Sequence, residues 1–97
     1  MIDKLTSSKR KLLFYSLEKM CNVIKQKILK GQELNALETI CDVNKYYIDS
    51  VIKYPEIKDN LSKLLENQYN SLLTTSKKRG YLLITEEIEK GIEIYKI

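Results

Sequence analysis

Apolar residues in the first third of the chain recur with the period of an α-helix. They step by four, three, four and four residues through Leu13, Leu17, Met20, Ile24 and Ile28. This spacing is typical of an amphipathic helix with one buried face. Ser7 or Ser8 offers a polar N-cap and Gly31 a stop signal, so we predict a helix that ends near Lys30.

Residues 1–7, ahead of this helix, are predicted to form a mobile tail. Phe14, Cys21 and Leu29 widen the apolar stripe beyond one narrow face. The helix is therefore a candidate dimer element, and a single core-facing helix in a monomer is the open alternative.

The middle of the chain predicts three further helices. Asn35 caps a helix to about Asp42, with Glu38 completing a capping box, and Asn44 caps another through about Lys53. Pro55 can open the next helix at its first position. Its apolar stripe comprises Ile57, Leu61, Leu64, Leu65 and Tyr69.

Residues 70–85 read NSLLTTSKKRGYLLIT, which is two short apolar runs around a polar tip. The runs cover 71–75 and 81–85, and the tip consists of Ser76, Lys77, Lys78, Arg79 and Gly80. Strand-forming residues around a short loop with glycine predict a β-hairpin. Gly80 would supply the positive φ that such loops require.

Thr85 can cap a last helix, with Glu86 and Glu87 favourably placed in its first turn. Ile88, Ile92 and Tyr95 would form its buried face. The alternating segment 92–97, IEIYKI, leaves a further strand open as an alternative.

At 97 residues the chain predicts one domain spanning 1–97. The net charge of +4 is unevenly distributed, because segments 1–30 and 70–80 carry +6 and +3 while the other segments are acidic. Two basic regions of this kind suggest a polyanion such as nucleic acid as the partner.

The residues that most enzyme and metal sites require are scarce. The chain has no histidine, and Cys21 and Cys41 lack the spacing of a zinc motif. With only three glycines it has no glycine-rich phosphate loop. We therefore expect no enzyme activity, no metal and no cofactor. No apolar stretch is long enough for a transmembrane helix and no signal peptide is recognisable, so we expect a cytoplasmic protein.

Helix, basic hairpin and helix in this order resemble the winged helix-turn-helix superfamily in its ArsR/MarR-like form. The segment DNLSKLLENQYNSLL is similar to that family's STVSRHLKKLEEAGLV pattern. The resemblance implies an α+β fold of four helices, a β-hairpin wing and a C-terminal helix. It also implies a recognition helix directly before the wing, with these DNA-facing residues: Lys58, Asn60, Ser62, Lys63 and Asn67.

A second alignment stays open. LETICDVNKYYIDSVIK resembles the helix-turn-helix run LAEALGLSxSTVSRHLK. In this alignment the turn lies at Asp42 and Val43, and the DNA-facing set is Asn44, Lys45, Tyr46, Tyr47 and Ser50.

Either alignment predicts a sequence-specific, dimeric binder of double-stranded DNA, with Lys77, Lys78 and Arg79 on phosphates. Lys9, Arg10 and Lys11 would add phosphate contacts. Small members of the superfamily resemble this chain, such as TcpK-like conjugation accessory proteins, TubR-like partition proteins and transcriptional regulators. This implies plasmid or phage DNA transfer, partition or regulation, with other plasmid or phage proteins as further partners.

The alternative function is a helical protein-interaction module that docks a partner through its first helix and does not bind DNA. It predicts binding that is indifferent to replacement of Lys77, Lys78 and Arg79.

Overall fold

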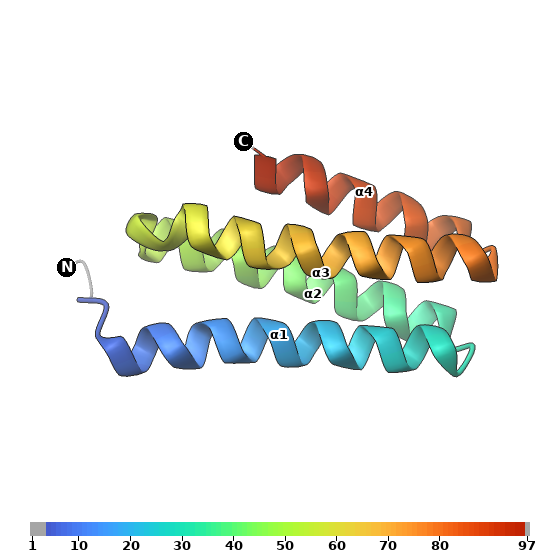
Figure 1. The fold of residues 1–97 in the computed structure, drawn as a ribbon, viewed down its shortest axis with the longest axis horizontal. Coiled ribbons are helices and arrows are strands. Elements are labelled where there is room, and N and C mark those ends of the chain that lie inside the picture. Colours follow the sequence, from blue (N-terminus) through green and yellow to red (C-terminus); the bar gives the residue numbers. More distant parts are fainter. Residues whose placement is uncertain (1–3, 97) are drawn as a thin grey trace.

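Four α-helices and one short 3₁₀-helix account for nearly all of the computed structural model, which describes residues 4–96 (Figure 1). The elements are α1 (Ser7–Leu29), α2 (Glu33–Lys53), η1 (Pro55–Ile57), α3 (Lys58–Arg79) and α4 (Leu82–Lys96). Residues 4–96 contain no β-strand. The fold is therefore an all-α bundle, and the predicted α+β winged helix-turn-helix is wrong.

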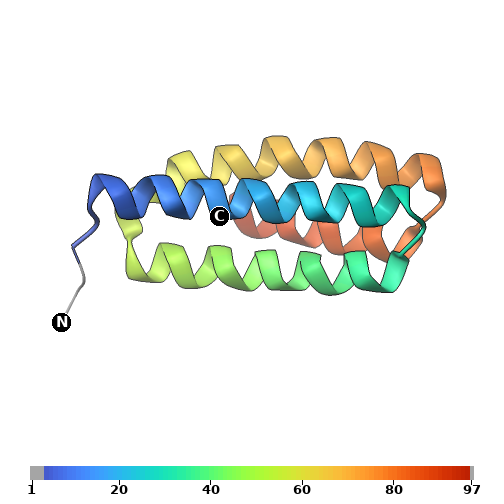
Figure 2. The same ribbon diagram turned by 90° about the horizontal axis from the view of Figure 1, so that it is seen from below.

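The helices form two antiparallel pairs packed side by side (Figures 1 and 2). α1 pairs with α2 and α3 with α4, while α1 also packs on α3 and α2 on α4. The bundle measures 44 × 24 × 19 Å along its principal axes. α4 is the shortest of the four and ends partway along the bundle.

The core follows directly from the helical spacing of apolar residues. On α1 the buried residues are Leu13, Leu17, Cys21, Ile24 and Ile28, nearly the predicted stripe. On α3 they are Leu61, Leu65, Tyr69, Leu72 and Ser76. The α3 stripe steps by four, four, three and four residues, so one continuous helix buries all five side chains.

Glycines in the left-handed conformation end α1 and α3. Gly31 has φ 76° and Gly80 has φ 73°. In each case the next residue closes the end, since the Gln32 amide donates to the Lys27 carbonyl and the Tyr81 amide to the Ser76 carbonyl. These are Schellman motifs, which satisfy helix carbonyls that otherwise lack partners. The prediction that Gly31 stops the first helix is confirmed.

The predicted hairpin wing is wrong, because α3 runs through 71–75 and through most of the predicted tip. Its threonines adapt to a helix, since Thr74 and Thr75 donate to the carbonyls of Asn70 and Ser71, four residues back. Gly80 does have a positive φ, but it ends a helix instead of turning a hairpin. A glycine after an apolar run is typical both of a helix end and of a hairpin turn.

The two predicted middle helices are one helix. α2 begins at Glu33 and continues through Asp42 and Asn44 to Lys53, so Asn44 is not a cap. The predicted helix after Pro55 is present, with η1 as its first turn.

The last predicted helix is confirmed as α4, although it starts at Leu82 instead of after a Thr85 cap. The alternative strand over 92–97 is wrong for 92–96, and Ile97 lies outside the described residues. In the predicted tail, residues 1–3 lie outside the described residues too, while Ser7 already belongs to α1, which Thr6 caps.

A buried polar cluster joins three helices at the bundle centre. The Asn44 side-chain oxygen accepts hydrogen bonds from the hydroxyls of Tyr69 at 2.9 Å and Tyr95 at 2.7 Å. The Tyr95 ring lies edge-on to that of Tyr47, with centroids 4.3 Å apart. Gly91 of α4 leaves the space that the Tyr69 ring occupies. Paired polar groups of this kind favour one alignment of the helices, because any shift would leave them unsatisfied.

Candidate functional site

An apolar hollow lies in the seam between the first half of α1 and the second half of α2. Its volume is about 350 Å³, and we call it the seam hollow. Its lining residues are Lys9, Leu12 and Leu13 of α1, Tyr46, Asp49, Ser50 and Lys53 of α2, and Tyr54. Leu13, Ser50 and Tyr54 are buried and form its floor.

The rim of the seam hollow combines two exposed apolar side chains with the exposed charged side chains of Lys9, Asp49 and Lys53. Leu12 is 64% exposed and Tyr46 is 37% exposed. Leu12 points outward because Leu13 and Leu17 hold α1 to the core, and neighbouring helical residues are turned by about 100° from one another. The hydroxyl of Ser50 donates to the Tyr46 carbonyl at 2.7 Å, so its hydrogen is not available to a ligand. The hollow is therefore suited to apolar side chains.

A second hollow, of about 330 Å³, follows farther along α1, around Val23. We call it the Val23 hollow. Its lining comprises Lys19, Asn22, Val23, Gln26, Lys27, Lys30 and Gln32. Lys27 reaches across to α2, where its ammonium group donates to the Thr39 hydroxyl at 2.7 Å. The Val23 hollow nevertheless lies mainly on α1 itself, and its lining residues beyond that helix are Lys30 at the C-cap of α1 and Gln32 at the N-cap of α2.

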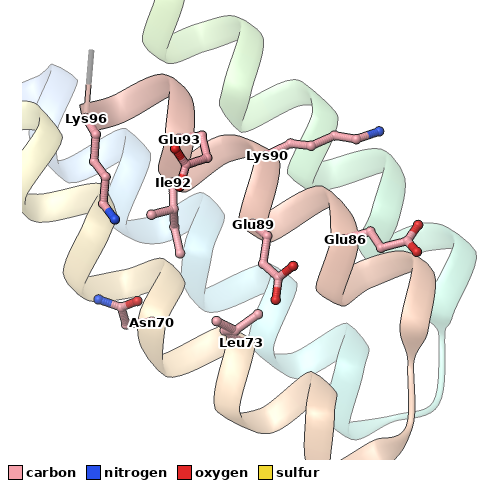
Figure 3. A pocket seen from close by; sticks show the side chains of 8 residues that line it. All are labelled: Asn70, Leu73, Glu86, Glu89, Lys90, Ile92, Glu93 and Lys96. Carbon is pink, nitrogen blue, oxygen red and sulfur yellow. The ribbon is translucent and has the colours of Figure 1, made fainter.

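A larger hollow, of about 610 Å³, lies between α3 and α4 (Figure 3). Glu86, Glu89 and Glu93 of α4 face it beside Asn70 and Leu73 of α3. Lys90 and Lys96 also line it and offset part of this charge, and outside the lining the Lys77 ammonium nitrogen lies 3.8 Å from a Glu89 oxygen. No large apolar side chain protrudes at its edge, since Ile92 is buried and Leu73 half-buried. It lacks the apolar anchors of the seam hollow.

The predicted wing residues lie at the end of α3 and in its cap. Ser76 is buried, with its hydroxyl oxygen 2.9 Å from that of Thr85. Lys77 pairs with Glu89, and the guanidinium of Arg79 donates to the Leu29 carbonyl at the end of α1. Cations in a last helical turn complement the helix dipole. Ser76, Lys77 and Arg79 thus have contacts within the bundle, although Lys77, Lys78 and Arg79 are all exposed.

The predicted recognition helix is the first half of α3. Some of its predicted DNA-facing residues are exposed and others pack against the bundle. Asn60, Lys63 and Asn67 are exposed, and their spacing places them along one outer line. Ser62 lies instead against α2, with its hydroxyl 2.6 Å from that of Tyr47. Lys58 is half-buried and begins the helix.

The predicted DNA-facing residues of the alternative helix-turn-helix alignment are likewise partly buried and partly exposed. Asn44, Tyr47 and Ser50 are buried in the bundle, whereas Lys45 and Tyr46 are exposed. The turn that this alignment requires is absent, because Asp42 and Val43 lie inside α2. This helix-turn-helix alignment is therefore wrong.

The predicted phosphate-contacting residues lie in the first turns of α1. Lys9 borders the seam hollow and Lys11 is exposed. Arg10 lies over the Phe14 ring, 5.3 Å from its centroid. Lys9 therefore lies beside Leu12 and Tyr46 in the seam hollow. The sequence did not predict this hollow, because Leu12 and Tyr46 are far apart along the chain.

The titratable groups of the core are held neutral. Burial, with a smaller contribution from Glu18, raises the pKa of the Cys21 thiol to about 12. Burial likewise raises the pKa of Tyr69 and of Tyr95 above the usual tyrosine range. At Cys41 desolvation and the nearby Glu87 carboxylate raise the thiol pKa as well. None of these groups has the lowered pKa of an activated nucleophile.

Within residues 4–96 no group of three or more acidic, cysteine or histidine side chains is placed to hold a metal ion. No helix in the same range has the length and apolar character needed to cross a membrane. Comparisons with known protein families, curated proteins and solved structures find no match to this chain.

Proposed function

We propose that the chain is a protein-docking domain that binds an amphipathic helix of a partner protein in the seam between α1 and α2. The observation that carries this proposal is the pair of exposed apolar side chains, Leu12 and Tyr46, at the rim of the seam hollow above a buried floor. Full burial of one side chain such as leucine contributes about 1.5–3 kcal/mol. An apolar residue of a partner that covers this rim would gain energy of that order.

A helix is the occupant that the shape favours. The hollow lies between two antiparallel helices, and side chains of a third helix pack into such grooves by the ridge-and-groove rule. Partner helices of this class present apolar anchors at i, i+3, i+4 and i+7. The long axis of the bundle, 44 Å, provides room for several turns of such a helix.

Binding of duplex DNA stays a prediction from the sequence. The hairpin wing no longer supports it, and the exposed cations of α1 still do. The predicted wing is a helix end in which Lys77 and Arg79 already have partners on the bundle. Exposed cations are still present at the start of α1, where Lys9 and Lys11 lie. A DNA titration therefore belongs in the same experiment.

The test is an amide NMR titration of the ¹⁵N-labelled chain with a synthetic neutral helical peptide. The peptide carries leucine at i, i+3, i+4 and i+7 and glutamine elsewhere. We expect shift changes concentrated at Leu12, Leu13, Tyr46 and Ser50. Leu12→Asp should weaken binding by about tenfold or more, the equivalent of losing about 1.4 kcal/mol.

The matched control is Leu82→Asp, since Leu82 is 67% exposed but belongs to α4. This variant should bind the peptide like wild type. Absence of binding, or binding that Leu12→Asp leaves unchanged, overturns the proposal. Shift changes at Lys77–Arg79 with a random duplex, and none with the peptide, would favour the DNA prediction instead.

A further inference from the structure

A straight line of residues on α1 runs from the seam hollow to the Val23 hollow. Leu12, Lys19, Val23 and Lys30 follow one another at intervals of seven, four and seven residues. Eleven and eighteen residues are close to three and five whole helical turns, so these positions share one side of the helix. The line spans about 27 Å at 1.5 Å per residue. Apolar and cationic positions alternate along it.

The surroundings of this line are strongly basic. The two hollows are lined by five lysines, namely Lys9, Lys19, Lys27, Lys30 and Lys53, and Asp49 is the one acid among their lining residues. Within residues 4–96, Lys9, Lys19 and Lys30 form no ion pair. Their charges are available to a ligand that lies along the seam.

We infer that the partner helix of the seam is acidic: it places apolar residues over Leu12 and Val23 and carboxylates opposite Lys9, Lys19 and Lys30. This inference rests on the proposed function and specifies its partner. Carboxylates at these places complement the charge, speed encounter and discriminate against neutral or basic helices. Apolar anchors over Leu12 and Val23 require about three turns, and a carboxylate opposite Lys30 extends the partner helix to about five turns, or about 18 residues.

A second copy of this chain fits poorly when the two seams face each other. Such a symmetric contact would bring each lysine-lined seam against its equivalent, and like charges repel. The acidic face of α4 in another copy, with Glu86, Glu89 and Glu93, is the remaining way for the chain to fill its own seam. The experiment therefore includes the oligomeric state.

The test compares three synthetic helical peptides of about 18 residues that share their leucine positions and carry glutamate, glutamine or lysine beside them. Dissociation constants are measured by fluorescence anisotropy at about 20 mM and about 500 mM salt, where charge screening differs severalfold. At low salt the glutamate peptide should bind about tenfold more tightly than the glutamine peptide, and the lysine peptide should bind worst. At high salt the differences should shrink.

Two charge-reversed variants locate the effect. Lys19→Glu/Lys30→Glu should remove most of the preference for the glutamate peptide and leave glutamine-peptide binding unchanged. Lys63→Glu/Lys78→Glu, on exposed positions of α3, makes the same charge change elsewhere. It should affect the preference much less, because the Debye length is about 10 Å at 0.1 M salt.

The outcomes separate the two proposals. If all peptides bind equally and Leu12→Asp weakens all of them, docking stands and the acidic partner is wrong. If none binds, the proposed function fails. Two further results overturn the acidic helix as the occupant: tighter binding of a random DNA duplex that depends on Lys19 and Lys30, or self-association in sedimentation that the same variant abolishes.

Discussion

The side-chain oxygen of Asn44 in α2 accepts a hydrogen bond of 2.7 Å from the hydroxyl of Tyr95 in α4, 51 residues away. The same oxygen accepts the hydroxyl of Tyr69 in α3 at 2.9 Å. One amide therefore ties three helices together inside the core. Together with the buried Ser76–Thr85 hydroxyl pair, these contacts favour one alignment of α4 with the rest of the bundle.

Asn44→Leu should lower the free energy of unfolding by about 2–4 kcal/mol, because the Tyr95 hydroxyl loses its acceptor and the Tyr69 hydroxyl keeps only the longer contact of 3.4 Å to the Ile40 carbonyl. Tyr95→Phe removes one hydroxyl and leaves Asn44 bonded to Tyr69, so it should cost only about 1 kcal/mol. Urea denaturation of both variants measures the difference. Equal losses would show that the cluster contributes no more than a single hydrogen bond.

Gly91→Ala should destabilise the bundle, although alanine is the better helix former. A Cβ at this position would lie 2.6 Å from Cε2 of Tyr69 and 2.8 Å from Oδ1 of Asn44. Overpacking typically costs about 1–3 kcal/mol, more than the gain of about 1 kcal/mol in helix propensity. A higher melting temperature would contradict this close packing. Lys90→Ala, on the exposed side of α4, is the control.

Gly80→Ala should cost about 1 kcal/mol, because alanine at φ 73° meets the steric penalty of left-handed backbone. An added Cβ has no atom within 4 Å, so the whole effect is conformational. Gly80→Asn should recover part of the loss, since asparagine tolerates this conformation better. Thermal unfolding distinguishes the two variants. Similar melting temperatures for wild type and alanine would argue against the Schellman end.

Arg79→Ala should lower the stability by about 0.5–1.5 kcal/mol, because the arginine donates to the Leu29 carbonyl across the bundle end. Lys78→Ala should lie within about 0.5 kcal/mol of wild type, as is usual for an exposed position. If both residues lay in a β-hairpin tip, the two substitutions would change the stability to the same extent. Denaturation curves of the two variants therefore test the role of the predicted wing directly.

The bundle should lose stability as the pH rises from about 9 toward about 12. An unfolded Cys21 thiol releases its proton near its ordinary pKa of 9.0, whereas the folded thiol has a pKa of about 12. In this range the unfolded state binds fewer protons, so the free energy of unfolding falls by about 1.4 kcal/mol per pH unit for one such group. Tyr69 and Tyr95, whose pKa values are raised in the fold, act in the same direction at higher pH.

Urea denaturation at several pH values between about 8 and about 10.5 measures this dependence. Cys21→Ala removes this thiol, so the stability of the variant should fall much less steeply where tyrosine does not yet titrate, and the remaining fall comes from Cys41, whose pKa is also raised in the fold. An unchanged slope in this variant would exclude Cys21 as the cause. The comparison is made as a slope because the substitution also changes the packing.

Sequence reasoning located the first helix and the existence of the last one, because each is marked by a local signal. The helical spacing of apolar residues from Leu13 to Ile28 can be read from neighbouring residues, and so can the helix end at Gly31. It failed at 70–80 because Leu72 and Ser76 continue the α3 stripe, while threonines and a glycine favour a hairpin just as well. It failed again at Asn44, which the sequence marks as a helix cap and the bundle uses as a buried acceptor.

The first helix and its excess of basic residues were determined by the sequence itself, since helical periodicity and charge are local properties. The tertiary structure alone decided that 71–79 is helical, because an extended segment there would leave Leu72 and Ser76 without the partners they meet in the bundle. The tertiary structure also created the seam hollow, because Leu12 and Tyr46 come to line one hollow only after α2 folds back on α1. Contacts between distant residues depend on how whole helices pack, which no local pattern specifies.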